Sequence, residues 1–191
     1  MTPFKARRRG GITATFDPAE ANVIANLASQ VVELLRDRNG ERVADTDPLV
    51  SELGLGGPSQ PPEDPVLQRL LPDAYRDSVE DSAEFRRFTE SSLSSAKVAN
   101  AETVLATLTA GGLDITDESA PTVEVELGPD EVQAWLRALT DIRLSLAVRL
   151  GIENEEDAML LDKSSDPALV AMGELYDWLG YVQETLVQAL S

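Results

Sequence analysis

The sequence predicts a mainly α fold: a helical bundle with a small antiparallel β-sheet, formed by an N-terminal hairpin plus one further strand. Three observations support this. Long segments repeat apolar residues at intervals of three and four, which is the helical period. Two short segments alternate apolar and polar residues, as a half-buried strand does. Gly-Gly, Asp-Pro and Gly-Pro pairs separate the segments. The length of 191 residues predicts a single domain, 1–191.

The N-terminal segments 3–9 and 11–16 are predicted to form the hairpin. The dipeptide Gly10-Gly11 between them permits positive φ at both turn positions. Every second residue of the following strand is apolar, which predicts one buried face. The residues of that face are Ile12, Ala14 and Phe16.

The first helix is predicted to begin at Asp17-Pro18. Asp17 suits the N-cap, proline suits the first helical position, and Glu20 comes close to completing a capping box. We expect the helix to end at Asn39-Gly40, a pair typical of helix C-termini. Its expected buried face consists of Val23, Leu27, Val31, Leu34 and Leu35.

Residues 40–64 are predicted to be a mobile, acidic, Pro/Gly-rich loop within the domain. Prolines and glycines are dense here, and the stretch is longer than most ordered loops. The Gly-rich piece 54–57 lacks the lysine that follows in a phosphate-binding loop. A short helix is expected over 65–71, because Pro72 closes it.

The second half of the chain predicts three long helices and one strand. The helices are expected at 78–109, 129–151 and 167–190, and Gly111-Gly112 stops the first of them. Strict alternation over 122–127 predicts a strand. We expect it to pair with the hairpin, because an isolated hairpin is only marginally stable.

The composition excludes several classes of function. The chain holds 34 acidic and 16 basic residues, for a formal net charge of -18, and no His or Cys. Catalysis by Ser-His-Asp or Cys-His groups, an ordinary zinc site and a disulfide switch are therefore excluded. We expect no enzymatic activity, no cofactor and no metal site. The basic start lacks the apolar run of a signal peptide, so a cytoplasmic location is expected, with no membrane association.

The N-terminal hairpin concentrates positive charge at Lys5, Arg7, Arg8 and Arg9. A strand would place alternate members on one face, where they could contact nucleic-acid phosphates or an acidic partner. The structural alternatives are a solvated edge strand whose charges deter edge-to-edge pairing, and pairing with the chain's own acids. The net charge of -18 disfavours DNA binding.

Arg86 and Arg87 are the second group of candidate partner-contact residues. Two glutamates of segment 84–90 stand three and four positions from them, which predicts ordinary helix-surface pairs, with partner contact as the alternative. Phe85 and Phe88 are expected to face the core. Nearby acids could hold a divalent cation, but stabilisation of a helix N-terminus explains them more simply. They are Asp77, Glu80, Asp81 and Glu84.

Two further predictions concern the last two helices. Arg143 flanks an apolar stripe, so we expect a partly buried, structural ion pair with Asp177 or Glu184, with ligand binding as the alternative. On the last helix, Trp178 and Tyr181 lie away from the main apolar stripe. These two aromatic residues are candidates for a homodimer or partner interface, and a central core helix is the alternative interpretation.

Four segments together, 4–35, 84–108, 131–152 and 176–190, resemble an actinobacterial family of domains of unknown function that includes AosR-type oxidative-stress transcriptional regulators. The resemblance covers nearly the whole chain except 40–64. It implies a cytoplasmic, non-enzymatic regulator of transcription that works through RNA polymerase or a sigma factor. Redox sensing in AosR-type proteins is attributed to a cysteine pair, which this chain lacks.

The leading hypothesis is therefore a regulator that acts by protein–protein contact with the transcription machinery, without cysteine redox sensing. The alternative is a DNA-binding regulator that uses the basic N-terminal hairpin. An enzyme that uses carboxylates and a metal is a third and much weaker hypothesis, because carboxylate pairs are abundant in any acidic protein.

Overall fold

The computed structural model describes residues 1–7, 10–44, 58–75, 77–114, 122–161 and 163–191. In these residues the fold is mainly α with a small antiparallel sheet, as predicted. The strands are β1 (Thr2–Ala6), β2 (Ile12–Phe16) and β3 (Val123–Leu127). The helices are α1 (Pro18–Ala44), α3 (Pro65–Leu70), α4 (Val79–Ala110), α5 (Pro129–Leu150), α6 (Glu155–Leu161) and α7 (Pro167–Gln188).

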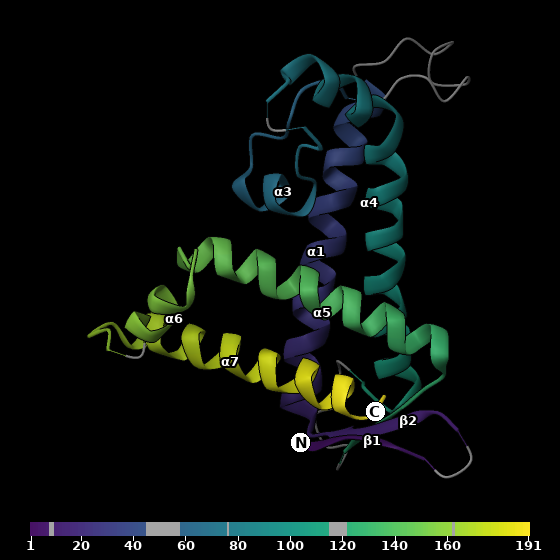
Figure 1. Ribbon diagram of the computed structural model, residues 1–191. Coiled ribbons are helices and arrows are strands. Elements are labelled where there is room, and N and C mark those ends of the chain that lie inside the picture. Colours follow the sequence, from purple (N-terminus) through teal and green to yellow (C-terminus); the bar gives the residue numbers. More distant parts are fainter. Residues whose placement is uncertain (8–9, 45–57, 76, 115–121, 162) are drawn as a thin grey trace.

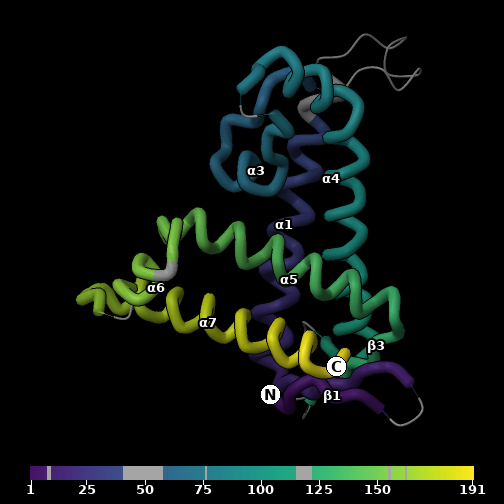
Figure 2. Tube along the Cα trace, in the orientation of Figure 1, coloured from purple at the N-terminus to yellow at the C-terminus, as the bar shows by residue number. Residues whose placement is uncertain are grey.

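The two longest helices form the axis of the molecule. α1 rises from the sheet and α4 returns to it, so they lie side by side and antiparallel (Figure 1). α5 packs across α4, and α7 packs against both α5 and β1. Both termini lie at the sheet end, and α3 lies toward the opposite end of the α1–α4 pair (Figure 2).

The sheet has the order β1-β2-β3, with every neighbouring pair antiparallel. The predicted pairing of strand 122–127 with the hairpin is thus confirmed: Ala14 stands opposite Val125, and Phe16 opposite Val123. Gly10 and Gly11 have φ angles of 88° and 82°, as the predicted turn requires. Alternate residues of β2 and β3 are buried against the helices, so the sheet has one covered and one polar face.

α1 begins as predicted and continues beyond its predicted end. The backbone N–H of Asp17 donates to Oε2 of Glu20 at 2.9 Å, and the N–H of Glu20 donates to Oδ1 of Asp17 at 2.8 Å. The helix passes Asn39-Gly40 and reaches Ala44, which corrects the expected boundary. Packing on α4 explains the difference: Nδ2 of Asn39 donates to Oγ of Ser94, so tertiary contact offsets the roughly 1 kcal/mol that a helical glycine costs.

The buried face of α1 is partly different from the prediction. Val31 and Leu35 are buried as expected, whereas Leu27 and Leu34 are only partly buried against the core. Alanines take the inner positions instead, which lets the neighbouring helices approach closely. The buried residues of α1 are Ala21, Ile24, Ala25, Ala28, Val31, Val32 and Leu35.

The predicted loop 40–64 divides into three parts. Residues 40–44 belong to α1, and residues 45–57 lie outside the described residues. Residues 58–64 form no helix or strand but contact the helices: the backbone carbonyl of Gln60 accepts from Nη2 of Arg38 at 2.9 Å. Asp64 then caps α3 through Oδ1, which accepts from the N–H of Val66 at 2.7 Å.

α4 matches the predicted helix at both ends. Ser78 is the N-cap and Gly111 the C-cap. Gly111 lies so close to β3 that a Cβ atom there would stand 2.5 Å from the carbonyl oxygen of Glu124. The Glu124 N–H donates to the Gly111 carbonyl at 2.9 Å, so the end of α4 is joined directly to the sheet.

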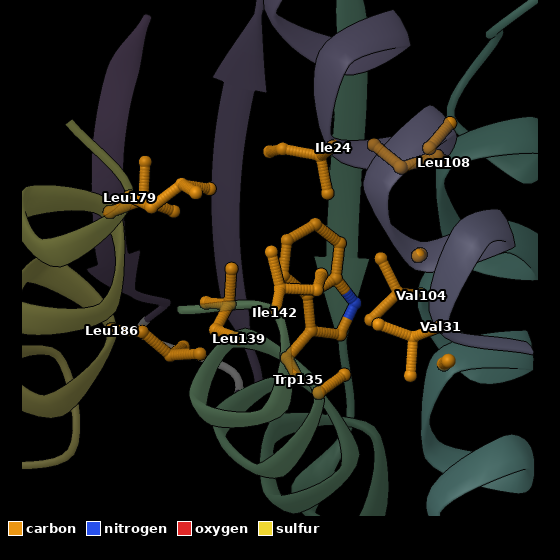
Figure 3. Close-up of a cluster of buried hydrophobic side chains, with 14 of the residues drawn as sticks. Ile24, Val31, Val104, Leu108, Trp135, Leu139, Ile142, Leu179 and Leu186 are labelled. Carbon is orange, nitrogen blue, oxygen red and sulfur yellow. The ribbon is translucent and has the colours of Figure 1, made fainter. Parts of the chain in front are cut away.

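The core gathers where the sheet meets α1, α4, α5 and α7 (Figure 3). Trp135 is 0% exposed, and its Nε1 donates to Oγ1 of Thr107 at 2.9 Å. Its indole stacks on Phe16 at 6.1 Å between ring centroids, and Phe4 meets it edge-on at 5.6 Å. One aromatic side chain therefore connects the sheet, α4 and α5.

The C-terminal third contains one helix that the sequence analysis did not predict. α6 lies between α5 and α7 and has only seven residues. α7 begins at the predicted Asp166 cap, whose Oδ1 accepts from the N–H of Ala168 at 2.9 Å. Within the described part of the chain, every helix is too short or too polar to cross a membrane.

Candidate functional site

The largest concentration of buried charge lies at the end of the α1–α4 pair that is remote from the sheet. Arg86 and Glu90 of α4 are 5% and 3% exposed. Nη1 of Arg86 lies 2.5 Å from Oε2 of Glu90, and its Nη2 lies 2.5 Å from Oδ1 of Asp73. Arg38 of α1 joins through its Nε, 3.2 Å from the other Glu90 oxygen. We call these four residues the α4 charge cluster.

The α4 charge cluster joins three segments that are distant in sequence. Arg86 comes from the first turns of α4, Arg38 from the last part of α1, and Asp73 from the segment after α3. Nη1 of Arg86 also donates to the Leu71 carbonyl at 3.3 Å, which fixes the end of α3. The charges of the α4 charge cluster thus neutralise one another. This arrangement suits a structural role rather than reaction with a substrate.

Electrostatics keep the Arg86 guanidinium ionised. Burial alone would lower its pKa, but the hydrogen bonds and negative charges of Glu90 and Asp73 outweigh that effect and raise the pKa above its usual value. The two carboxylates therefore favour the charged form of the Arg86 guanidinium.

The placement of segment 84–90 differs from the prediction. Arg86 and Glu90 were expected on the helix surface, with Phe85 and Phe88 toward the core; the structure shows the reverse, with Phe85 46% and Phe88 57% exposed. The inner row of this part of α4 is polar, with Ser82 and Ser94 completing it at intervals of four. The four-residue spacing of these polar side chains could have identified the buried side of the helix. The general tendency of apolar side chains to be buried favoured the opposite side, which carries Phe85 and Phe88. Arg87 lies exposed.

A second buried ion pair joins α4 to α5. Nζ of Lys97 lies 2.6 Å from Oδ1 of Asp141, which is buried. Burial raises the pKa of the Asp141 carboxyl, and the hydrogen bond and charge of Lys97 partly offset that rise. Sequence reasoning did not find this pair, because its members are far apart in the chain and nothing local links them.

The basic hairpin is only partly described. Arg7, just after β1, forms an ion pair with Glu126 of β3, which agrees with pairing to the chain's own acids. Lys5 is exposed on β1. Arg8 and Arg9 lie outside the described residues. Of the four basic residues, the described part of the chain thus places Lys5 in solvent and Arg7 in an ion pair.

Arg143 is held by α7, but not by the predicted carboxylates. Its Nη1 donates to Oε1 of Gln183 at 3.0 Å, and its guanidinium carbon lies 4.8 Å from the centre of the Tyr176 ring. The expected pair with Asp177 or Glu184 is thus replaced by a neutral amide and an aromatic face. A guanidinium on an aromatic ring is attracted by the ring quadrupole, so α5 and α7 are joined without a second charge.

On α7 the two candidate interface residues differ. Trp178 is partly buried against the core, whereas Tyr181 is 47% exposed. Leu179, Val182 and Leu186 fill the core side of the helix. The homodimer contact through the two aromatic residues stays a prediction.

The acidic residues near the start of α4 do not assemble into a metal site. Within the described ranges, no group of three or more Asp, Glu, His or Cys residues is arranged to hold a metal ion. Asp81 instead donates its backbone N–H to Oγ of the N-cap Ser78 at 3.2 Å, so these acids belong to a capped helix start.

Comparison with known proteins gives one consistent result. The family described as "Domain of unknown function (DUF2017)" matches residues 1–190. Proteins named "Oxidative stress regulator AosR" from Mycobacterium bovis and Mycobacterium tuberculosis are 32% identical over 186 residues, covering 91% of this chain and 79% of theirs. A relative from Mycobacterium leprae is 30% identical over 188 residues, with the same coverage of both chains. No solved structure matches the chain.

Proposed function

Because the chain belongs to the DUF2017 family, we propose that it is a non-enzymatic, cytoplasmic regulator of transcription that acts through protein–protein contact with the transcription machinery. The observation that carries the proposal is the name of its relatives, oxidative stress regulator, together with a similarity that extends over 91% of this chain. The names of these relatives favour a regulatory role. We propose RNA polymerase or a sigma factor as the partner.

The charged groups of the described structure support a binding role rather than a catalytic one. Glu90 of α4 pairs with Arg38 of α1, and Lys97 of α4 pairs with Asp141 of α5, so these charges join helices. A catalytic acid or base needs access to a substrate proton, which buried and mutually paired groups do not offer.

The alternative is a DNA-binding regulator that uses the basic hairpin. The ion pair of Arg7 with Glu126 weighs against it, because an arginine that is paired internally releases fewer counterions from phosphates. The formal charge of -18 adds a long-range repulsion from DNA.

We expect affinity purification of the tagged chain from its native host to recover RNA polymerase or a sigma factor, identified by mass spectrometry. The washes contain ~150 mM salt, at which the Debye length is about 8 Å, so that weak charge contacts are screened. Nuclease treatment is the control that separates the two candidates. Recovery that survives nuclease supports protein contact; retention that depends on DNA and falls steeply with salt would support the DNA-binding alternative.

We also expect peroxide to leave the fold and the oligomeric state unchanged until methionine is oxidised. The chain has no Cys, so no disulfide can form, and slow oxidation of three methionines is the expected sulfur chemistry. Light scattering and circular dichroism would follow the protein while mass spectrometry counts added oxygens. A change of assembly before any oxygen is added to Met1, Met159 or Met172 would contradict this.

A further inference from the structure

The outer side of α4 near its start carries an unusual set of exposed apolar side chains. Half of the four phenylalanines of the chain are here, although large apolar residues are normally buried. We define the α4 aromatic patch as Tyr75, Phe85, Phe88 and Leu93, all of which are exposed. A contiguous apolar surface of this kind marks a site of interaction in folded proteins.

The patch is held in place by the structure beneath it. The rings of Tyr75 and Phe85 meet edge-on, 6.0 Å apart between centroids. Ser82 fixes the Tyr75 backbone twice: Oγ accepts from its N–H at 3.1 Å and donates to its carbonyl at 2.6 Å. The α4 charge cluster lies on the inner side of the same turns, so these aromatic side chains cannot rotate inward without displacing buried, paired charges. The patch is therefore preorganised, which lowers the cost of binding.

The shape of the patch fits an elongated partner. Phe85, Thr89 and Leu93 succeed one another at intervals of four along α4 and line a shallow hollow together with Asp73. Eight residues of helix correspond to about 12 Å, the length of roughly two turns of a helix laid alongside. An amphipathic helix that lays its apolar face along such a row of side chains is a common mode of protein recognition.

Two exposed carboxylates of α4 stand beside the aromatic rings of the patch. Asp81 precedes Phe85 by four positions and Glu84 precedes Phe88 by four, so each carboxylate is a neighbour of an aromatic ring on the helix surface. Arg87, which is also exposed, stands about 160° around the helix from Phe85 and about 100° from Phe88. Carboxylates at the rim of an apolar surface favour a partner with Lys or Arg beside its own apolar residues.

We propose that the α4 aromatic patch is the docking surface for an amphipathic helix of a partner protein, whose apolar face is flanked by Lys and Arg. The proposal rests on the proposed function, because it names the surface through which that protein contact is made. A second copy of this chain is a poorer occupant: it carries the same acidic rim and the same charge of -18, so the two surfaces repel each other.

The direct test uses a synthetic helix of about 18 residues, five turns, with leucines on one face and lysines flanking them. A matched peptide replaces every lysine with glutamate. Binding is measured by fluorescence anisotropy at ~150 mM salt, where charges beyond about 8 Å are screened. We expect the lysine peptide to bind at least ~10-fold more tightly than the glutamate peptide. Equal binding of the two peptides would overturn the proposal.

Variants of the protein locate the binding surface. F85S/F88S is expected to raise the Kd for the lysine peptide about 10-fold or more, as loss of central aromatic contacts does. The control is Tyr181→Ser, which removes a comparably exposed aromatic ring from α7 and should leave the Kd unchanged. An equal effect of both changes would show non-specific adhesion to an acidic protein and reject the proposal. D81K/E84K, which keeps the aromatic rings, should weaken the lysine peptide and strengthen the glutamate peptide.

Two further measurements exclude other occupants. Because Phe85 and Phe88 are exposed, F85S/F88S should keep the wild-type melting temperature; a clear fall would show that the chain's own residues cover the patch. Light scattering of wild type and F85S/F88S should give the same mass; a dimer lost in the variant would make the second copy the occupant. If purification from the host recovers no transcription protein while the peptide results hold, the proposed function fails and the docking surface stands.

Discussion

Replacing Trp135 with alanine should cost about 3–5 kcal/mol of the free energy of unfolding, a typical loss for a large aromatic side chain removed from a core. Trp135 is fully buried between Phe4, Phe16 and the long helices, and nothing near it can collapse into the space without moving the sheet or a helix. The Oγ1 of Thr107, also buried, would lose its indole donor. Small domains have total stabilities of about 5–15 kcal/mol, so this one change removes a large part.

The measurement is urea unfolding followed by far-ultraviolet circular dichroism, since the substitution removes a fluorophore. The matched control is Trp178→Ala, which removes the same side chain from a site that is only partly buried against the core. We expect the loss for Trp178 to be clearly smaller. Equal losses for the two tryptophans would mean that the sheet–helix junction is not the centre of stability.

The second large effect concerns the α4 charge cluster. Arg86→Ala should cost about 3–5 kcal/mol, because it leaves Glu90 buried with only Arg38 beside it. The side chains of Arg86 and Glu90 are 5% and 2% exposed, so solvent screens the pair very little. Removal of Arg86 also frees the Leu71 carbonyl and Asp73, so the segment that follows α3 should loosen from α4.

A double substitution distinguishes two quantities: the net contribution of the Arg86–Glu90 ion pair to stability, and the free-energy cost of leaving one buried charge without its partner. Arg86→Met with Glu90→Leu replaces both charges by apolar side chains of similar size, and we expect most of the lost stability to return. Arg38 keeps the Gln60 carbonyl as an acceptor in this variant. If the double variant is as unstable as Arg86→Ala, the charges themselves stabilise the fold and the interpretation of the cluster as a costly but specific junction is wrong. Urea unfolding at neutral pH measures all three proteins.

Trp135 and the α4 charge cluster also show which structural features could be predicted from the sequence. Trp135 belongs to a set of apolar residues that recur at the helical period along α5, and this period predicts the buried face without knowledge of the partner. In segment 84–90 the same reasoning assigned the wrong side of the helix to the core. Either the side with Phe85 and Phe88 or the side with Arg86 and Glu90 could face inward without breaking helical geometry. The polar side faces inward because Arg38 and Asp73 supply partners for its charges.

Among the candidate functional residues, prediction identified the helix that Arg143 contacts but not its partners there. Arg143 was correctly expected to be held against α7, but its partners, Gln183 and Tyr176, are neutral, since a choice among side chains on one helix depends on the packing angle of the two helices. The exposed aromatic patch was missed entirely. Whether a side chain is exposed depends on its neighbours in the tertiary structure, and the local sequence around Phe85 does not identify those neighbours.

The sequence by itself determined the fold class, the starts of the long helices and the exclusion of thiol and imidazole chemistry. Caps at Asp17, Ser78 and Asp166 act within one turn, and the register of strand 122–127 follows from its own alternation, so local free energies suffice. Only the tertiary structure decided that α1 continues past Gly40, that Arg86 lies inside and that Phe85 lies outside. These outcomes differ by a few kcal/mol at most, and contacts between segments dozens of residues apart supply that difference.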